Sequence, residues 1–301
     1  MLPALIVAAA LLAQDASVRS QQRPIASRSQ TDQTVNVQKG MRVELRDCAG
    51  EVIVKTWDRD AVRVRAQHSS RTKVDVTPRN QVLNIQQDGR SGVDFELTVP
   101  AWISLTLDGT ECFMDVEGLA GNFTGNTVEG DVVLRGLGGT ATIEAIEGNV
   151  TIEGGRGRIQ VQTTEGDITV SKAAGELMLE SIDGDIRVNE VSASALEIST
   201  VDGDIFFGSA LQPSGRYRFE THDGDIWLAL PENGSATITI RQFDEGSRID
   251  ITLPLKLVTE TQRGRRRSYT LGGGSAQVEI ESFDGSIHLR KAGEVPKKDP
   301  R

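Results

Sequence analysis

The stretch EGDITV at residues 165–170 is one of six similar copies that decide the fold of this chain. Each copy has an acidic residue, a glycine, an aspartate or asparagine, and then alternating apolar positions. The copies are EGDVVL at 129–134, EGNVTI at 147–152, EGDITV at 165–170, DGDIRV at 183–188, DGDIFF at 202–207 and DGDIWL at 223–228. Their glycines lie 18, 18, 18, 19 and 21 residues apart, so one structural unit repeats with a nearly fixed period.

Each repeat predicts two short strands. The second and fourth positions after the glycine are apolar, as at Ile168 and Val170, and a second apolar pair precedes the next turn, as at Leu177 and Leu179. Alternation with a period of two is typical of half-buried strands. Few core side chains per repeat mean that neighbouring repeats must supply the remaining burial, at a strand spacing of about 4.8 Å. We therefore expect an all-β fold, a parallel β-solenoid, with an antiparallel meander as the alternative.

The repeat extends beyond the six copies. Cys112 holds the glycine position 18 residues before Gly130, and glycines at Gly246, Gly264 and Gly285 continue the series. This predicts about nine rungs over residues 110–292. Residues 34–109 contain short runs of alternating apolar residues, which predict an N-terminal cap of β-strands.

The ends of the chain indicate export. Residues 2–13 (LPALIVAAALLA) are too short to span a bilayer and lie where a signal peptide has its apolar region, so we expect a signal peptide over 1–16 and no membrane span after its cleavage. Residues 17–33 are polar and predict a disordered linker, and 293–301 predict a disordered tail. The expected location is therefore the periplasm, the cell surface or the medium. The net charge of −10 argues against a nucleic-acid partner.

Export makes the two cysteines candidates for a disulfide. Disulfides persist in oxidising compartments, where Cys48 and Cys112 can pair. Two separate small apolar residues at turns are the alternative. A bridge requires the two Cα atoms to lie within about 7 Å of each other.

The sequence resembles a bacterial domain family of unknown function labelled "putative adhesin". The resemblance is carried by the repeated Gly-Asp-Ile/Val turns, by KTWDRDAVRVRA at 55–66 and by FELTVPAWISLTLDG at 95–109, and it covers about residues 34–291. Cys112 departs from the glycine expected at the first turn. The resemblance implies an exported β-strand-repeat protein without established chemistry.

Acidic residues recur beside every turn glycine. Oxygen ligands repeated along one edge can hold Ca²⁺, which takes six to eight of them. The alternative is that aspartate and asparagine flank the glycine because their side chains hydrogen-bond to the local backbone. We expect the second use, without a bound cofactor or metal. The candidate ladder consists of Asp131, Asp167, Asp185, Asp204 and Asp225.

One column outside the predicted core becomes aromatic at Phe206 and Trp227. Outward aromatic side chains on adjacent rungs can stack on sugar rings or contact another protein, and cover by the C-terminal segment is the alternative. The segment QRGRRRSYT adds arginines at a predicted turn, which can dock a phosphate or an acidic glycan. Neutralisation of the neighbouring acids, or a solvated loop, is the alternative that we expect.

The repeat argues against catalysis. A catalytic carboxylate pair is local, whereas these acids recur on each repeat and are explained by the turn. His68, His222 and His288 show no metal-ligand spacing. We expect a non-catalytic, adhesin-like binding or structural surface of the cell envelope, with a glycan or surface protein as the ligand class. A carbohydrate-active β-helix enzyme and a calcium-binding repeat protein are the alternatives.

Overall fold

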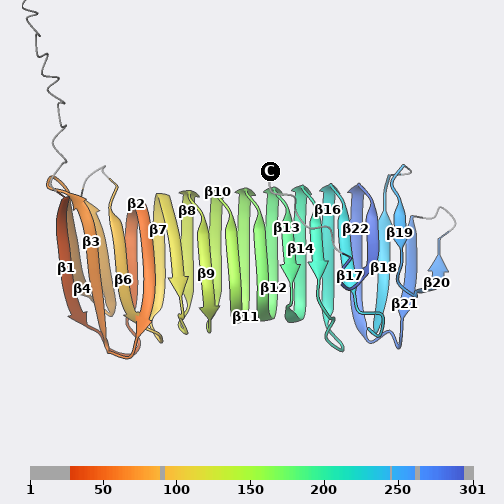
Figure 1. Cartoon of the computed structure of the whole chain (residues 1–301), viewed down its shortest axis with the longest axis horizontal. Coiled ribbons are helices and arrows are strands. Elements are labelled where there is room, and N and C mark those ends of the chain that lie inside the picture. Colours follow the sequence, from red (N-terminus) through yellow and green to blue (C-terminus); the bar gives the residue numbers. More distant parts are fainter. Residues whose placement is uncertain (1–27, 89–91, 245, 262–264, 295–301) are drawn as a thin grey trace, which may run out of the picture.

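The computed structural model describes residues 28–88, 92–244, 246–261 and 265–294, and every regular element in these ranges is a β-strand (Figure 1). The all-β prediction is confirmed, and the fold is solenoid-like. The strands are β1 (Arg28–Asn36), β2 (Arg42–Trp57), β3 (Ala61–Ser69), β4 (Lys73–Arg79), β5 (Val82–Asp88), β6 (Asp94–Pro100), β7 (Ser104–Glu117), β8 (Phe123–Glu129), β9 (Val132–Leu137), β10 (Ala141–Glu147), β11 (Val150–Glu165), β12 (Ile168–Asp183), β13 (Ile186–Asn189), β14 (Ser192–Asp202), β15 (Ile205–Gly208), β16 (Arg216–Asp223), β17 (Ile226–Leu230), β18 (Ala236–Gln242), β19 (Ile249–Ile251), β20 (Lys256–Glu260), β21 (Arg266–Leu271), β22 (Ala276–Asp284) and β23 (Ile287–Lys291).

Some predictions fall outside these ranges. The signal peptide expected over 1–16, residues 17–27 of the linker and residues 295–301 of the tail are not among the described residues. In the part of the chain that is described, no helix has the length and apolarity needed to cross a membrane.

The strands form two long stacks that face each other. The strands before each turn glycine form what we call the pre-turn sheet, in the spatial order β4, β5, β2, β7, β8, β10, β11, β12, β14, β16, β22, β18, β21, β20. Those after it form the post-turn sheet, in the order β1, β3, β6, β2, β7, β9, β11, β12, β13, β15, β17, β23, β19. The long strands β2, β7, β11 and β12 contribute to both. Figure 1 shows these strands side by side along the elongated molecule.

The turn glycines set the spacing of the repeat. Gly184 has a φ of 153°, and its N–H donates to the carbonyl of Asp202 on the next repeat at 3.0 Å. A Cβ at this position would collide with the carbonyl oxygen of Gly166 on the preceding repeat. A side chain is therefore excluded both by the backbone conformation and by the neighbouring turn.

The core lies between the two sheets. The predicted inward pairs are buried, including Ile168 and Val170 after a turn and Leu177 and Leu179 before the next. A column of buried hydroxyl groups closes the core beside the turns. These hydroxyls donate to turn carbonyls, as Thr221 does to Gly203 at 3.3 Å, which satisfies groups that burial would otherwise leave unpaired.

The N-terminal strands continue the same stack. β2 pairs in parallel with β7 on one side and with β5 and β6 on the other, so residues 82–100 lie outside residues 42–57 although they follow them in sequence. The segment expected to be a separate cap is thus part of the stack, and only the antiparallel strands β1, β3 and β4 cover its end. A parallel neighbour on each side satisfies both edges of β2.

The predicted linker ends earlier than residue 33. Residues 28–36 form β1, which pairs antiparallel with β3. The side chain of Arg63 on β3 binds both carboxylate oxygens of Asp32, at 2.8 and 2.6 Å. Polar composition suggested disorder, but the exposed edge of β3 supplies backbone partners that the sequence pattern does not reveal.

The C-terminal rungs differ from the prediction. The turn of Gly224 pairs directly with that of Gly285, because the Gly224 N–H donates to Asp284 at 3.1 Å and β16 pairs with β22. Gly246 does not continue the column, and Gly264 lies outside the described residues. The chain first forms β18 and β19 one rung further out, folds back through β20 and β21, and then fills the gap with β22 and β23.

Candidate functional site

The outward side of the pre-turn sheet carries columns of exposed side chains beside a hollow. Inward and outward residues alternate, so Arg158, Gln160 and Gln162 point away from the core that Ile159 and Val161 enter. Parallel pairing repeats this arrangement on each adjacent strand. The sheet therefore converts the sequence period into columns of side chains on one flat face.

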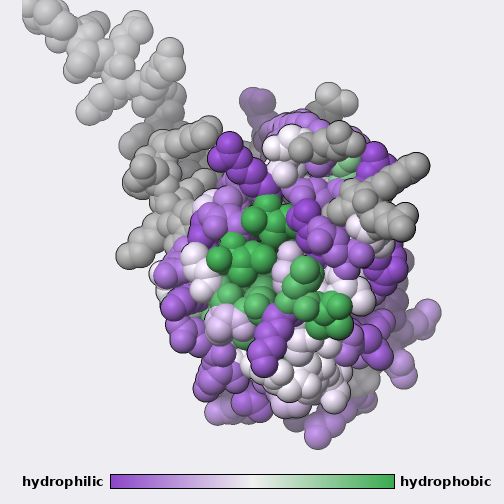
Figure 2. Space-filling view, turned by 90° about the vertical axis from the view of Figure 1, so that its right-hand side faces the viewer, coloured by the Kyte–Doolittle hydropathy of each residue, from purple (hydrophilic) through white to green (hydrophobic). Residues whose placement is uncertain are grey.

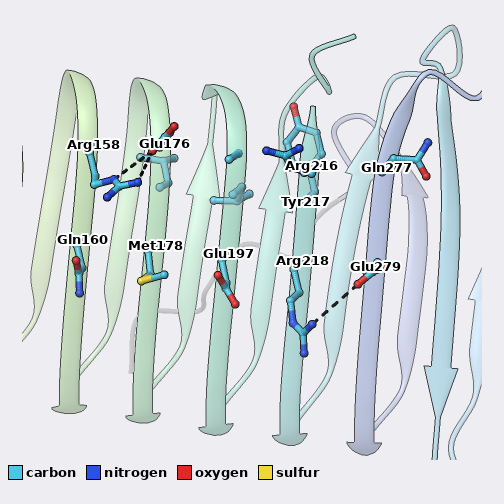
Figure 3. Close-up of a pocket in the computed structure, with 13 residues that line it drawn as sticks. Arg158, Gln160, Glu176, Met178, Glu197, Arg216, Tyr217, Arg218, Gln277 and Glu279 are labelled. Carbon is cyan, nitrogen blue, oxygen red and sulfur yellow. Dashed lines mark hydrogen bonds and ion pairs between the residues drawn. The ribbon is translucent and has the colours of Figure 1, made fainter. Parts of the chain in front are cut away.

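A hollow of about 430 Å³ lies on this face, between β11 and β22 (Figure 3). The short side chain of Ala195 leaves this hollow open, because Ala195 stands in a column between Glu176 and Arg216, whose side chains are much longer. Ser194 is an extra residue in the register of β14 against β12, and it accounts for the 19-residue step in the repeat. Met178 and Ala195 form a half-buried floor.

Tyr217 fixes one side of the floor. Its hydroxyl donates to the carbonyl of Ala193 at 2.7 Å and accepts from the N–H of Gln212 at 2.6 Å. Burial raises the pKa of this phenol above its ordinary value, while the Gln212 hydrogen bond opposes that rise. The phenol therefore stays neutral and holds the loop before β16 against the sheet.

Three arginines border the hollow, and they differ in their partners. Arg158 contacts Glu176 at 2.7 Å, and Arg218 contacts Glu220 at 2.8 Å. The hydrogen bond to Glu220 raises the pKa of Arg218, with further contributions from nearby glutamates. Arg216 forms no ion pair with any acidic residue of the described segments, and its side chain is exposed. Arg216 is thus the guanidinium available to a ligand's acidic group.

An apolar ridge runs along one edge of the same face. It consists mainly of apolar residues two positions before the turn glycines, which pairing in register places in line, and Ile182 is 53% exposed. The polar residues Thr164 and His222 occupy the same column. At its C-terminal end the ring of Phe283 stacks on Phe243 at 4.5 Å. The ridge residues are Val128, Ile146, Ile182, Val201, Phe283 and Phe243.

The ridge borders a second hollow of about 570 Å³ on the pre-turn face. Glu144, Gln162 and Glu180 line its other side. Exposed apolar side chains gathered on one face are typical of contact surfaces, because their exposure to water is unfavourable. The two hollows and the ridge together make the pre-turn face the candidate binding surface.

The acidic ladder is a hydrogen-bonded structural feature. In this column each side-chain Oδ1 accepts the backbone N–H of the equivalent residue on the next rung, as Asp167 does from Asp185 at 3.0 Å and Asp185 does from Asp204 at 3.0 Å. The partner is thus the neighbouring rung rather than the residue's own turn. The acceptors in order are Asp131, Asn149, Asp167, Asp185, Asp204 and Asp225.

Charge accumulates within this ladder. Burial raises the pKa of Asp204 above its ordinary value, and the carboxylates of Asp185 and Asp225 raise it further, while the hydrogen bond from the Asp225 backbone and the charge of Arg187 lower it. Among the described residues, no group of three or more His, Cys, Asp or Glu side chains is arranged to hold a metal ion.

The aromatic column on the post-turn face is a closed stack. Phe206 is only 5% exposed, and the guanidinium of Arg187 lies 3.6 Å from the centre of its ring. The ring of Trp227 stacks on His288 at 3.7 Å. Because both rings already have partners, the structure does not present Phe206 and Trp227 as a free platform for sugars.

Other sequence candidates fall at scattered places. Cys48 and Cys112 form a disulfide between β2 and β7, with Cα atoms 5.6 Å apart. His68 hydrogen-bonds to Thr31 at 2.9 Å, and His222 lies beside Phe283, so the three histidines do not meet. Within the arginine-rich segment Arg267 contacts Glu260 at 2.8 Å, and Arg263 lies outside the described residues.

Sequence reasoning missed both the hollow and the ridge. The ridge had a signal, because Val128, Ile146, Ile182 and Val201 all stand two positions before a turn glycine. The hollow had none, because its C-terminal wall, Gln277 and Glu279, reaches it only through the return of β22 beside β16.

Comparison with known proteins places the chain in a family. The profile of the family described as Toastrack DUF4097 matches residues 41–290, and no curated protein matches. Among solved structures, one described as a putative cell adhesion protein from Clostridium sporogenes shares 8% identity at a TM-score of 0.23, covering 88% of this chain and 99% of its own. Another, described as a putative adhesin from Parabacteroides distasonis, shares 11% at a TM-score of 0.33, covering 87% and 98%. The family profile spans most of the chain: this protein belongs to the Toastrack DUF4097 family.

Proposed function

We propose that this protein is an exported, non-catalytic binding protein of the cell envelope, which uses the pre-turn face as an adhesin-like surface. The proposal includes a signal peptide over 1–16 followed by a linker, a single β-solenoid that extends to about residue 292, and a short tail. The parallel pairing of successive repeats supports the single solenoid. The disulfide between Cys48 and Cys112 supports export, since such bonds persist in oxidising compartments.

The hollow on the pre-turn face carries the binding role. It combines a floor formed by Met178 and Ala195 with the exposed guanidinium of Arg216. Apolar floors with a few polar groups at the rim are typical of ligand sites, and a guanidinium recognises carboxylates through paired hydrogen bonds. We therefore propose a carboxylate-bearing glycan as the ligand.

The acids of the ladder have a structural use, which supports a non-catalytic role. The Oδ1 atoms of the ladder accept backbone hydrogen bonds, as Asp204 does from Asp225 at 2.7 Å, so a structural reason accounts for their recurrence. A glycosidase needs one carboxyl group as a proton donor beside the substrate and a second across from it. At the hollow, Glu176 contacts Arg158 at 2.7 Å and Glu279 lies 4.0 Å from Arg218, and these two acids are thus engaged with arginines.

The test is binding of the purified, labelled protein to an array of neutral and carboxylate-bearing glycans. We expect retention on the carboxylate-bearing members and its loss in Arg216→Ser. Arg71→Ser is the matched control, because Arg71 is exposed near the other end of the molecule and its loss removes the same charge. Equal binding by both variants, or no binding by the wild type, contradicts the proposal. Release of shorter fragments from any glycan favours the carbohydrate-active enzyme instead.

A further inference from the structure

The two ends of the stack are finished differently. At the N-terminal end the outermost pre-turn strand is β4, which carries exposed Lys73, Pro78 and Arg79. Charged residues and proline on an edge strand prevent another strand from pairing with it. No large apolar side chain is exposed in residues 28–88 or 92–109. This end is therefore protected against association.

The C-terminal end differs, because its edge strand has no proline and exposes apolar side chains, although it carries a lysine and a bulge at Val258. Its outermost pre-turn strand is β20, which pairs only with β21 within the described residues. All five residues of β20 are exposed, and Leu257 and Val258 are 54% and 61% exposed. Figure 2 looks onto this end and shows apolar side chains gathered at its centre within a polar rim.

The apolar end is continuous with the core. Ile249, Ile251 and Leu255 are only partly buried and pack against the core residues of the last rungs. On the post-turn side the stack ends at β19, which pairs only with β23 in the described segments. Repeat proteins need a polar terminal unit to close the core, and at this end the strands β20 and β21 extend only the pre-turn sheet.

We propose that this end binds a second copy of the same chain, forming a two-fold dimer in which β20 pairs antiparallel with β20 of the other copy. The charge pattern of β20, KLVTE, selects this occupant. In the register centred on Val258, Lys256 faces Glu260 of the second copy on both sides of the axis. Glu260 is 43% exposed although it contacts Arg267 at 2.8 Å, so its carboxylate has room for a second partner.

The same register places the apolar residues together. Val258 meets Val258 of the second copy at the axis, and Leu257 lies opposite Thr259 beside it. Val258 is an extra residue in the pairing of β20 with β21, and such a bulge changes the direction of the strand and of its side chains. A two-fold interface is closed, so association stops at the dimer. The proposal does not depend on the glycan-binding role of the pre-turn face.

The test is sedimentation velocity of the purified protein across about 1–100 µM, the range expected for an interface of small area. We expect the mass to rise from that of a monomer to twice that value. Val258→Lys should remain monomeric throughout the range. The matched control is Ile182→Lys, which places the same charge at a similarly exposed position on the ridge and should still dimerise.

A charge exchange tests the register. Lys256→Glu and Glu260→Lys should each weaken dimerisation at least tenfold, and the double variant should restore it, because the two charges then face each other in reversed order. Circular dichroism and the Tm of each variant check that the fold is kept. A wild type that stays monomeric, masses above the dimer, loss of the dimer in Ile182→Lys, or no recovery in the double variant would each overturn the proposal.

Discussion

Replacement of Asp204 by asparagine should stabilise this protein at neutral pH. Asp204 stands in the ladder between Asp185 and Asp225, and its Oδ1 accepts the N–H of Asp225 at 2.7 Å. An asparagine keeps that acceptor, as Asn149 does in the same column by accepting from the N–H of Asp167 at 3.0 Å. The substitution therefore removes the charge and keeps the hydrogen bond between rungs.

The magnitude follows from the two neighbouring carboxylates. At a strand spacing of about 4.8 Å, each pair of like charges costs about 1 kcal/mol even in water. Arg187 offsets part of this cost, and a neutral acceptor binds the Asp225 N–H about 1 kcal/mol less strongly than a carboxylate. We expect a net gain of about 1 kcal/mol in the free energy of unfolding, or about 2–4 °C in Tm.

The gain in stability from Asp204→Asn should increase with pH. Burial and the neighbouring acids raise the pKa of Asp204 in the folded state above the ordinary value of 3.8. The protonated side chain therefore stabilises the fold below pH 3.8, and this contribution is lost as the pH rises through the raised value. The difference between the asparagine variant and the wild type should be largest at pH 7 and vanish below about pH 4.

The assay is thermal unfolding of both proteins from pH 3.5 to pH 8. The control is Asp131→Asn, because Asp131 is exposed and its neighbour in the ladder is Asn149 rather than an acid. A gain in the control equal to that of Asp204→Asn, a loss of stability at pH 7, or a gain independent of pH would refute the reasoning. A wild type that calcium stabilises, and an asparagine variant that it does not, would instead favour the calcium-binding alternative.

Two further predictions concern the stack. Gly184→Ala should lower the free energy of unfolding by about 2–4 kcal/mol, measured by urea denaturation, because its Cβ would meet the carbonyl of Gly166 in a strained backbone conformation. Gly136 has a φ of 65° and no atom within 4 Å of an added Cβ, so Gly136→Ala should lower the free energy of unfolding by only about 1–2 kcal/mol. Equal losses in the two variants would show that contact with the neighbouring turn is not the cause. Cys48→Ser should lower stability by about 4 kcal/mol, since the bridge closes a loop of 64 residues, and dithiothreitol should bring the wild type to the same Tm; a reductant without effect would argue against the bridge.

The local unit could be predicted from the repeat. The glycine turn, the alternation around it and the inward pairs such as Ile168 and Val170 are local properties, because each follows from backbone conformation and a period of two. The column of aspartates could be predicted for the same reason, since equal spacing puts equal residues in line. Its hydrogen bonds could not, because each donor belongs to the next rung, as when Asp185 accepts from Asp204.

The ends of the molecule could not be predicted in this way. Gly246 fits the repeat period but does not lie in the column of turn glycines. The reason is that β22 pairs with β16, so that β18 lies one rung further out. Which strand pairs with β16 depends on contacts between residues far apart in the sequence, and the repeat period does not indicate the spatial order of the strands. The same is true of β1, whose polar residues become a strand only because β3 offers an unpaired edge.

The sequence by itself determined that the chain is all-β, that its turns need glycine and that its core is built from alternating apolar pairs, because these depend on each residue and its near neighbours. Only the tertiary structure decided that Arg216 faces a hollow beside Ala195, that Phe206 lies under Arg187, and that Leu257 and Val258 remain uncovered. The physical reason is that exposure belongs to a residue's surroundings, and those surroundings are supplied by strands that lie far away along the chain.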